Sequence, residues 1–137
     1  MAHWLVKSEP SVYGWDQMVK DKRTFWSGVR NHQAAANMKA MKKGDLAFFY
    51  HSGEGKEIVG VVRVAKEYYP DHTDETGKFG MVDLEAVKPL KRPVTLKAIK
   101  EDAKLKDFGL VRQGRLSVVP VSDTHWALLT KMAGEKA

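Results

Sequence analysis

The chain has 137 residues, 43% of them hydrophobic, and its 23 Lys and Arg against 17 Asp and Glu give a formal net charge of +6 and an isoelectric point near 9.5. This length predicts a single domain over residues 1–137, and the basic excess favours a polyanionic partner such as nucleic acid. Because there is no cysteine, disulfides, thiol nucleophiles and cysteine-based zinc sites are excluded.

The beginning of the sequence, MAHWLVKSEP, lacks the charged leader and apolar stretch of a secretory signal. No run approaches the roughly 20 apolar residues of a membrane span. We therefore expect a cytoplasmic protein with no membrane partner. The five histidines show no HExxH or HxH spacing, so we expect no metal site, and no cofactor is predicted.

The first part of the chain predicts one strand, one short helix and one loop. Residues 3–7 are aromatic and aliphatic and stop before Pro10, which is typical of a strand. Ser11 is the expected cap of a helix that ends in the charged run 20–23. Its apolar face carries Trp15, Met18 and Val19. The apolar residues of segment 25–31 show neither helical nor strand periodicity, which predicts a loop.

The middle of the chain predicts a helix followed by an antiparallel hairpin. Asn31 is a plausible N-cap for HQAAANMKAMKKG, which ends in cations and Gly44. The segments DLAFFYHS and EIVGVVRVAKEYY are rich in aromatic and β-branched residues and flank a glycine-containing turn. They predict two paired strands, and residues 79–87 predict a third, reaching toward Pro89 and Pro93.

The last part predicts two helices around a final strand. Thr95 opens the helical segment TLKAIKED, and LSVVPV reads as a strand. Ser122 begins a capping segment before a helix that places Trp126, Leu129 and Met132 near one face.

This order of elements predicts an α+β fold, because strands and helices do not alternate strictly. We expect a small, partly open β-barrel, mixed or antiparallel, with peripheral helices. An α/β sheet stays possible, although the aromatic hairpin has too short a connection for a parallel crossover.

Polar and aromatic residues gather where predicted strands begin or end. The clusters are Ser8 with Glu9, Trp26 with Arg30 and Asn31, Tyr50 with His51 and Ser52, and residues 112–117. If the strand ends meet at one rim, they form a pocket with stacking faces and hydrogen-bonding groups, which suits a base extruded from nucleic acid. The alternative, favoured on the residues alone, is that Trp26 and Tyr50 are core aromatics. Glu9 and Asn31 can equally be simple caps.

Catalysis finds little support in the sequence. Ser8 with Glu9, or His51 with Ser52, could form an acid–base pair, but the nucleophile motif GxSxG is absent. The nucleotide motifs GxxxxGK[ST] and GxGxxG are also absent. We expect a protein that is not an enzyme.

Five blocks in order along the chain carry a family resemblance. They are WLVKSEP at 4–10, W-S-GVRN at 26–31, MKKGDLAFFYHS at 41–52, IVGVVRV at 58–64 and GRLSVVPV at 114–121. Through them the sequence resembles the EVE domain family, which is thymocyte-nuclear-protein-like. Five ordered blocks are far more specific than one short motif.

The resemblance implies a PUA-like β-barrel related to YTH and ASCH domains, with a pocket for a modified base. Modified cytosine in DNA is the favoured ligand of EVE domains, and modified RNA that of their YTH relatives. Carried over by position, the resemblance implies that Trp26 and Tyr50 wall the base and that Ser117 and Val118 close the far side. The implied polar readers are Ser8, Glu9, Asn31 and Ser52, and the implied mouth residues, near phosphate, are Arg30, Arg112 and Arg115.

The leading hypothesis is a nucleic-acid binding module that recognises a modified base after base flipping, with DNA favoured over RNA. One alternative is an enzyme or subunit acting on modified nucleotides or RNA. Another is a small-molecule or protein-interaction module, whose ligand binding would be insensitive to salt.

Overall fold

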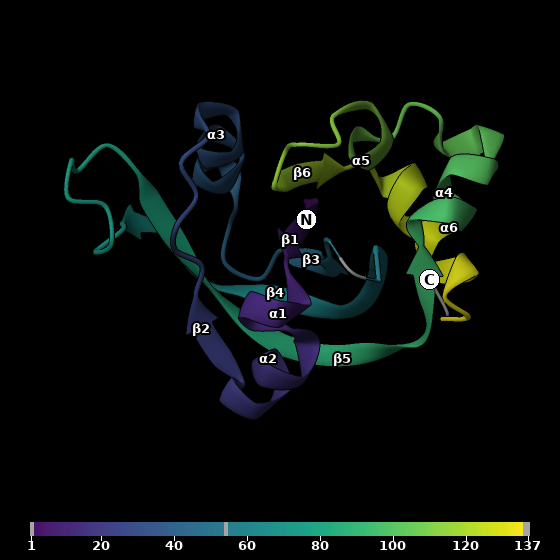
Figure 1. The fold of residues 1–137 in the computed structure, drawn as a ribbon, viewed down its shortest axis with the longest axis horizontal. Helices are drawn as coiled ribbons and strands as arrows, with labels where there is room; N and C mark the ends of the chain where they lie inside the picture. The colour runs from purple at the N-terminus through teal and green to yellow at the C-terminus, as the bar shows by residue number, and fades with distance from the viewer. Residues whose placement is uncertain (1, 54, 136–137) are drawn as a thin grey trace.

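A computed structural model describes residues 2–53 and 55–135, so four positions of the predicted domain 1–137 lie outside this description. The elements lie around one sheet, with α3 at the upper left of the view, α1 and α2 at the bottom and α4 and α6 together at the right (Figure 1). In chain order they are β1 (His3–Ser8), α1 (Pro10–Tyr13), α2 (Trp15–Asp21), β2 (Arg23–Phe25), α3 (His32–Ala40), β3 (Leu46–His51), β4 (Glu57–Pro70), β5 (Gly80–Thr95), α4 (Leu96–Glu101), the 3-10 turn η1 (Ala103–Leu105), α5 (Gly109–Arg112), β6 (Val118–Val121) and α6 (Asp123–Met132).

The sheet has six strands in the order β2-β5-β4-β3-β1-β6 and is mixed. β1 pairs in parallel with β3 and antiparallel with β6, and the β3–β4–β5 meander is antiparallel as predicted. The α+β class with peripheral helices is confirmed.

The sheet does not close into a barrel over the described residues, because β2 and β6 remain edge strands. β2 is only three residues long, and the outer edge of β6 is occupied by a helix. There the Asn37 amide of α3 donates to the Val118 carbonyl at 2.8 Å. A helical side chain thus satisfies a backbone group that a closing strand would otherwise pair with.

Most predicted elements are present, and three need correction. Phe25, the first residue of the predicted loop 25–31, belongs to strand β2. Ser11 is not a helix cap, since it lies inside α1, where Glu9 holds the N-cap position and Pro10 begins the helix. A break at Gly14 then separates α1 from α2. The third strand continues past both prolines to Thr95, because register shifts in its pairing with β4 tolerate residues that lack an N–H.

Local capping explains why the correctly predicted helices begin where they do. The side chains of Asn31, Thr95 and Ser122 each accept a hydrogen bond from a backbone N–H in the first turn of α3, α4 and α6. No helix in the described part of the chain is both long and apolar enough to cross a membrane.

The sheet and the N-terminal helices are locked by a close contact between Trp15 of α2 and Gly60 of β4. A Cβ atom at Gly60 would lie 2.5 Å from two indole carbons, so only glycine lets the ring approach. Phe49 of β3 packs against the same indole, with ring centroids 5.3 Å apart.

Replacing Gly60 with alanine is expected to lower the free energy of unfolding by about 1–3 kcal/mol, because the added methyl group forces the buried indole or the strand to move. Urea denaturation measures the loss. Gly114→Ala is the matched control, since nothing lies within 4 Å of its Cβ position. Equal stability of the two variants would contradict the close contact.

Candidate functional site

A cavity of about 520 Å³ opens between the end of β1, α1, the segment from β2 to α3 and the start of β6. Among the described residues, its lining contains aromatic, hydroxyl, amide and cationic side chains but no Asp, Glu, His or Cys. The lining residues are Lys7, Ser8, Val12, Tyr13, Thr24, Phe25, Trp26, Ser27, Gly28, Val29, Arg30, Asn31 and Ser117. Sequence reasoning named five of them: Ser8, Trp26, Arg30, Asn31 and Ser117.

The aromatic wall of the cavity is built from Tyr13 and Trp26, whose rings meet edge to face with centroids 6.1 Å apart. Trp26 is only 7% exposed and also packs on Phe49 at 5.7 Å, so it belongs to the core and the cavity at once. Burial, together with a hydrogen bond to Asp21, raises the pKa of the Tyr13 hydroxyl to about 12. This hydroxyl therefore stays protonated at neutral pH.

Two polar side chains of the cavity keep hydrogen-bonding capacity for a ligand. The Ser8 hydroxyl donates to the Tyr13 carbonyl at 2.6 Å, which leaves its oxygen able to accept. The Asn31 side-chain oxygen accepts from the Ala34 N–H at 2.9 Å, and its NH₂ group forms no other hydrogen bond among the described residues. One acceptor and one two-proton donor are thus held by fixed backbone contacts.

Lys7 is a cavity residue that sequence reasoning missed. Its ammonium group donates to the Gly114 carbonyl at 2.8 Å and lies 5.9 Å from the centre of the Tyr50 ring. Burial lowers its pKa. Alternation along β1 gives no signal for it, because adjacent residues such as Lys7 and Ser8 are predicted to point to opposite faces of the sheet.

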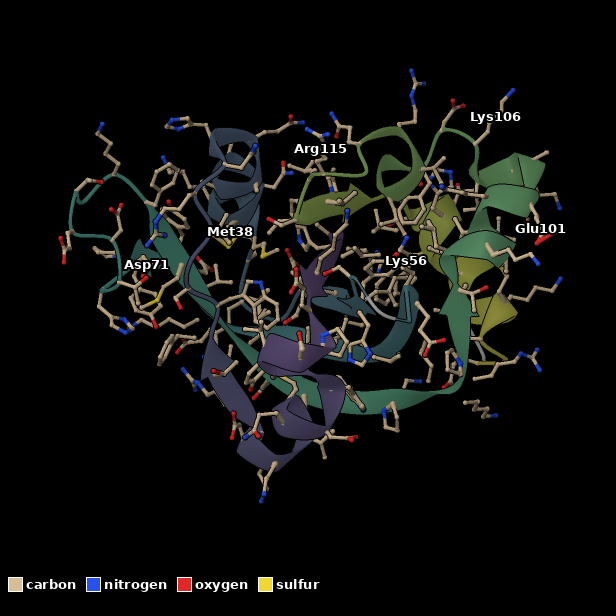
Figure 2. All side chains as sticks on the ribbon, in the orientation of Figure 1. Met38, Lys56, Asp71, Glu101, Lys106 and Arg115 are labelled. Atoms are coloured by element: carbon tan, nitrogen blue, oxygen red, sulfur yellow. The ribbon has the colours of Figure 1, made fainter. Side chains whose placement is uncertain are left out.

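The loop that carries Trp26 and Asn31 is fixed by Asp71, a buried residue that sequence reasoning also missed. Asp71 Oδ2 accepts from Gly28 N at 2.8 Å and from Arg30 Nη1 at 3.0 Å, and Oδ1 accepts from Thr73 N and Oγ1 at 2.7 and 2.6 Å. Asp71 follows the end of β4, on the left of the view (Figure 2).

The charge of Asp71 is held in place by these contacts. Burial alone would raise its pKa, but the hydrogen bonds from Thr73, Gly28 and Arg30 outweigh burial and hold the pKa well below its usual range. Gly28 has a φ of +84°, the left-handed conformation in which its N–H meets the carboxylate. The cavity loop is therefore anchored by one ionised carboxylate.

The comparisons with known proteins agree on one family. The EVE domain matches residues 2–132. Chicken thymocyte nuclear protein 1 is 35% identical, over 98% of this chain and 69% of the relative. The chain belongs to the EVE domain family. This confirms the resemblance noted in the sequence.

Solved structures share the fold of this EVE domain closely. A protein of Rhodopseudomonas palustris is 54% identical with a TM-score of 0.93, covering 98% of this chain and 94% of the other. Human THYN1, solved in complex with 5-methylcytosine-containing DNA, is 31% identical with a TM-score of 0.89, and the match covers 100% of both chains.

Two residues that were predicted to form walls of the cavity lie in the core instead. Tyr50 is 3% exposed within β3 and lies beneath Lys7, which takes the place at the cavity. Val118 is fully buried, and its carbonyl already accepts from Asn37. Ser117 does line the cavity, but its carbonyl accepts from the Lys7 N–H at 3.0 Å, so it closes the wall as part of the strand pairing.

Two predicted polar readers lie outside the cavity lining. Glu9 is exposed at the start of α1, where its carbonyl accepts from Val12 and Tyr13, and its side chain extends toward Gly53. Ser52 donates its N–H to the Ser8 carbonyl at 3.0 Å and extends the pairing of β1 with β3. The backbone groups of both residues hold the chain in place next to the cavity.

The three predicted mouth arginines occupy different places in the structure. Arg30 lines the cavity, but its guanidinium is engaged by Asp71 and by Thr73 Oγ1 at 3.0 Å, so it anchors the loop. Arg112 pairs with Asp107 at 3.2 Å on the surface, and Arg115 lies at the top of the view, far from Asp71 (Figure 2). Neither lines the cavity, and their contact with phosphate stays a prediction.

A second, wider hollow of about 710 Å³ lies beside the start of α4. It is lined by three lysines and one glutamate and contains no aromatic ring. Its residues are Gly55, Lys56, Thr95, Leu96, Lys97, Lys100 and Glu101. Although larger, it offers no aromatic surface from the described residues on which a planar ligand could stack, so the first cavity is the candidate site.

The two histidines without a family role have structural contacts. His51 Nε2 accepts from the Trp15 N–H at 3.0 Å and so fixes the start of α2. Burial lowers the pKa of His51, against the opposing effect of Glu57 and Asp16, which keeps Nε2 free to accept. His32 packs against Phe79 at 5.0 Å.

Proposed function

We propose that this EVE domain binds DNA and takes a modified cytosine, such as 5-methylcytosine, out of the duplex into the cavity. The observation that carries the proposal is a cavity of about 520 Å³ in which the partly buried Tyr13 and the buried Trp26 lie beside the Ser8 hydroxyl and the Asn31 amide. The human relative solved with 5-methylcytosine-containing DNA supports the choice of ligand. Planar heterocycles are held by this combination of aromatic surface and edge contacts.

The polar groups match the edge of cytosine, which presents an amino donor beside ring-nitrogen and carbonyl acceptors. The Ser8 oxygen can accept from the amino group, because its own proton is already given to Tyr13. The Asn31 NH₂ group and the Lys7 ammonium can donate to the acceptors. Thymine carries a carbonyl where cytosine has the amino group, so it would lose the Ser8 contact.

The methyl group itself contributes modest selectivity. Burying one methyl-sized group is worth about 0.8 kcal/mol, which corresponds to about a four-fold preference over unmodified cytosine. Val29 and the Tyr13–Trp26 wall supply apolar surface for such burial.

We propose a binding module rather than an enzyme. In the described part of the chain, the lining of the cavity contains no Asp, Glu, His or Cys, the residues that most often act as general acids, bases or nucleophiles. The high pKa of Tyr13, about 12, also makes it a poor proton donor at neutral pH.

Asn31→Asp tests the site without unfolding α3, because aspartate caps a helix as well as asparagine does. The change removes the NH₂ donor and places a carboxylate in the cavity. We expect affinity for a duplex with one 5-methylcytosine to fall at least about ten-fold. Fluorescence anisotropy at fixed salt measures it, with unmodified duplex and the matching RNA as comparisons.

Thr95→Asp is the matched control. It also replaces a helix N-cap, adds the same negative charge and lies in the second hollow. We expect it to change affinity little. An equal loss in both variants would mean that binding follows net charge alone, and salt-insensitive binding of free nucleoside with no DNA affinity would favour a small-molecule module.

A further inference from the structure

Two exposed apolar side chains belong to the cavity lining. Large hydrophobic side chains in the described residues are exposed at Val12, Val19, Phe25 and Val87, by 79%, 47%, 47% and 40%. Val12 and Phe25 line the cavity, and the other two do not. Single exposed hydrophobic residues are ordinary on protein surfaces, so the significance lies in this pairing at one opening.

The two residues have matching positions in the chain. Val12 directly precedes Tyr13, and Phe25 directly precedes Trp26, so each exposed side chain is followed by one ring of the cavity wall. The backbone thus presents one apolar group outward and one aromatic group inward, on both α1 and the end of β2.

Among the described residues, neither side chain has a packing role that explains why an apolar residue stands at these exposed positions. The four residues of α1 include none that is buried, so Val12 contributes nothing to the core. The Phe25 ring meets the exposed His72 imidazole edge to face, with centroids 4.7 Å apart, and 47% of the residue faces solvent.

We propose that Val12 and Phe25 cover the bases on either side of the extruded nucleotide. This rests on the proposed function. Extruding a base leaves a gap in the stack and exposes the faces of its neighbours, and proteins that distort DNA fill such gaps with apolar side chains. A phenylalanine can stack on a neighbouring base whatever its identity, and a valine can fill the gap beside it.

The proposed role differs from that of the cavity wall. Tyr13 and Trp26 contact the extruded base itself, whereas Val12 and Phe25 act only when neighbouring bases are present. The two side chains therefore stabilise the opened duplex far more than they affect recognition of the isolated base.

The test uses the double variant Val12→Ser/Phe25→Ser and the control Val19→Ser/Val87→Ser, which removes the two other exposed large apolar groups of the described residues, both away from the cavity. Two ligands are compared, a duplex with one 5-methylcytosine and the free nucleoside 5-methyl-2′-deoxycytidine. Anisotropy measures duplex binding, and calorimetry or NMR titration measures nucleoside binding.

We expect the cavity-side double variant to bind the duplex about ten-fold or more weakly, from the loss of base stacking, and to lose much less affinity for the nucleoside, which the Tyr13–Trp26 wall holds. The control variant should match wild type with both ligands. Unchanged duplex affinity in the cavity-side variant, or a parallel loss with the nucleoside, would overturn the proposal. If the wild-type protein binds neither the duplex nor the nucleoside, the proposed function itself is wrong. That result differs from the two outcomes that would overturn only the role of Val12 and Phe25.

Discussion

Asp71→Asn is expected to lower the free energy of unfolding at pH 7 by about 3 kcal/mol. The asparagine NH₂ group would face two donors, the Gly28 N–H and the Arg30 guanidinium, and would leave that cation without its partner. Arg30 is 40% exposed, so solvent screens part of its charge and the loss stays below that of a fully buried pair. Urea denaturation measures the difference.

The same variant has a pH signature. Because the pKa of Asp71 is lower in the folded than in the unfolded chain, its contribution is complete above the ordinary carboxyl value of about 3.9 and is lost as pH falls below it. The wild type should therefore lose more stability than the variant between pH 5 and pH 3. DNA binding should also weaken, since Gly28 and Arg30 line the cavity.

Asp74→Asn is the control for Asp71. Asp74 accepts from Thr76 N and Oγ1 as Asp71 does from Thr73, in the same loop, but it has no hydrogen bond to Arg30 or Gly28. We expect a smaller loss of stability and unchanged binding. If the two variants lose equal stability and affinity, the carboxylate of Asp71 does not anchor the cavity loop.

Trp26→Ala is expected to lower the free energy of unfolding by about 3–5 kcal/mol, because it removes a buried ring that packs on both Tyr13 and Phe49. Trp26→Phe keeps an aromatic ring and is the variant for binding. We expect it to reduce affinity for 5-methylcytosine DNA about ten-fold, since the shorter ring withdraws one wall of the cavity.

Trp15→Phe separates binding from stability. Trp15 is 8% exposed against 7% for Trp26, and its ring also meets Phe49 edge to face, but it does not line the cavity. Thermal unfolding should show similar losses for the two phenylalanine variants, and anisotropy should show weaker DNA binding only for Trp26→Phe. Equal DNA affinity of the two variants would show that Trp26 does not contact the bound base.

Features set by neighbouring residues were predictable from the sequence. The Asn31 cap and the antiparallel meander depend on residue types at short spacing. Ser8, Trp26 and Asn31 were grouped because each lies where a predicted element begins or ends, and the three do line one cavity. Trp26 was predicted either as a core aromatic or as a wall of the base pocket, and it is both. One side of its ring packs in the core, and the other forms the cavity wall.

Features that depend on contacts distant in sequence were not predictable. Tyr50 follows two phenylalanines in a strand covered on both faces, so its alternation gives no indication of which side is open. The spacing of Asp71 and Thr73 is typical of an Asx turn, but nothing local indicates that the carboxylate reaches a loop 41 residues earlier.

The position of β1 between β3 and β6 has a consequence for how the molecule folds. Lys7 and Ser117, from opposite ends of the chain, meet across this pairing and line the same cavity. Pairings between segments so distant in sequence are slow to form, because a long loop must first be closed. During synthesis the β3–β4–β5 meander can form before β6 has been made and has paired with β1. The ligand site is complete only when that final strand docks. Ligand binding would therefore report the last step of folding.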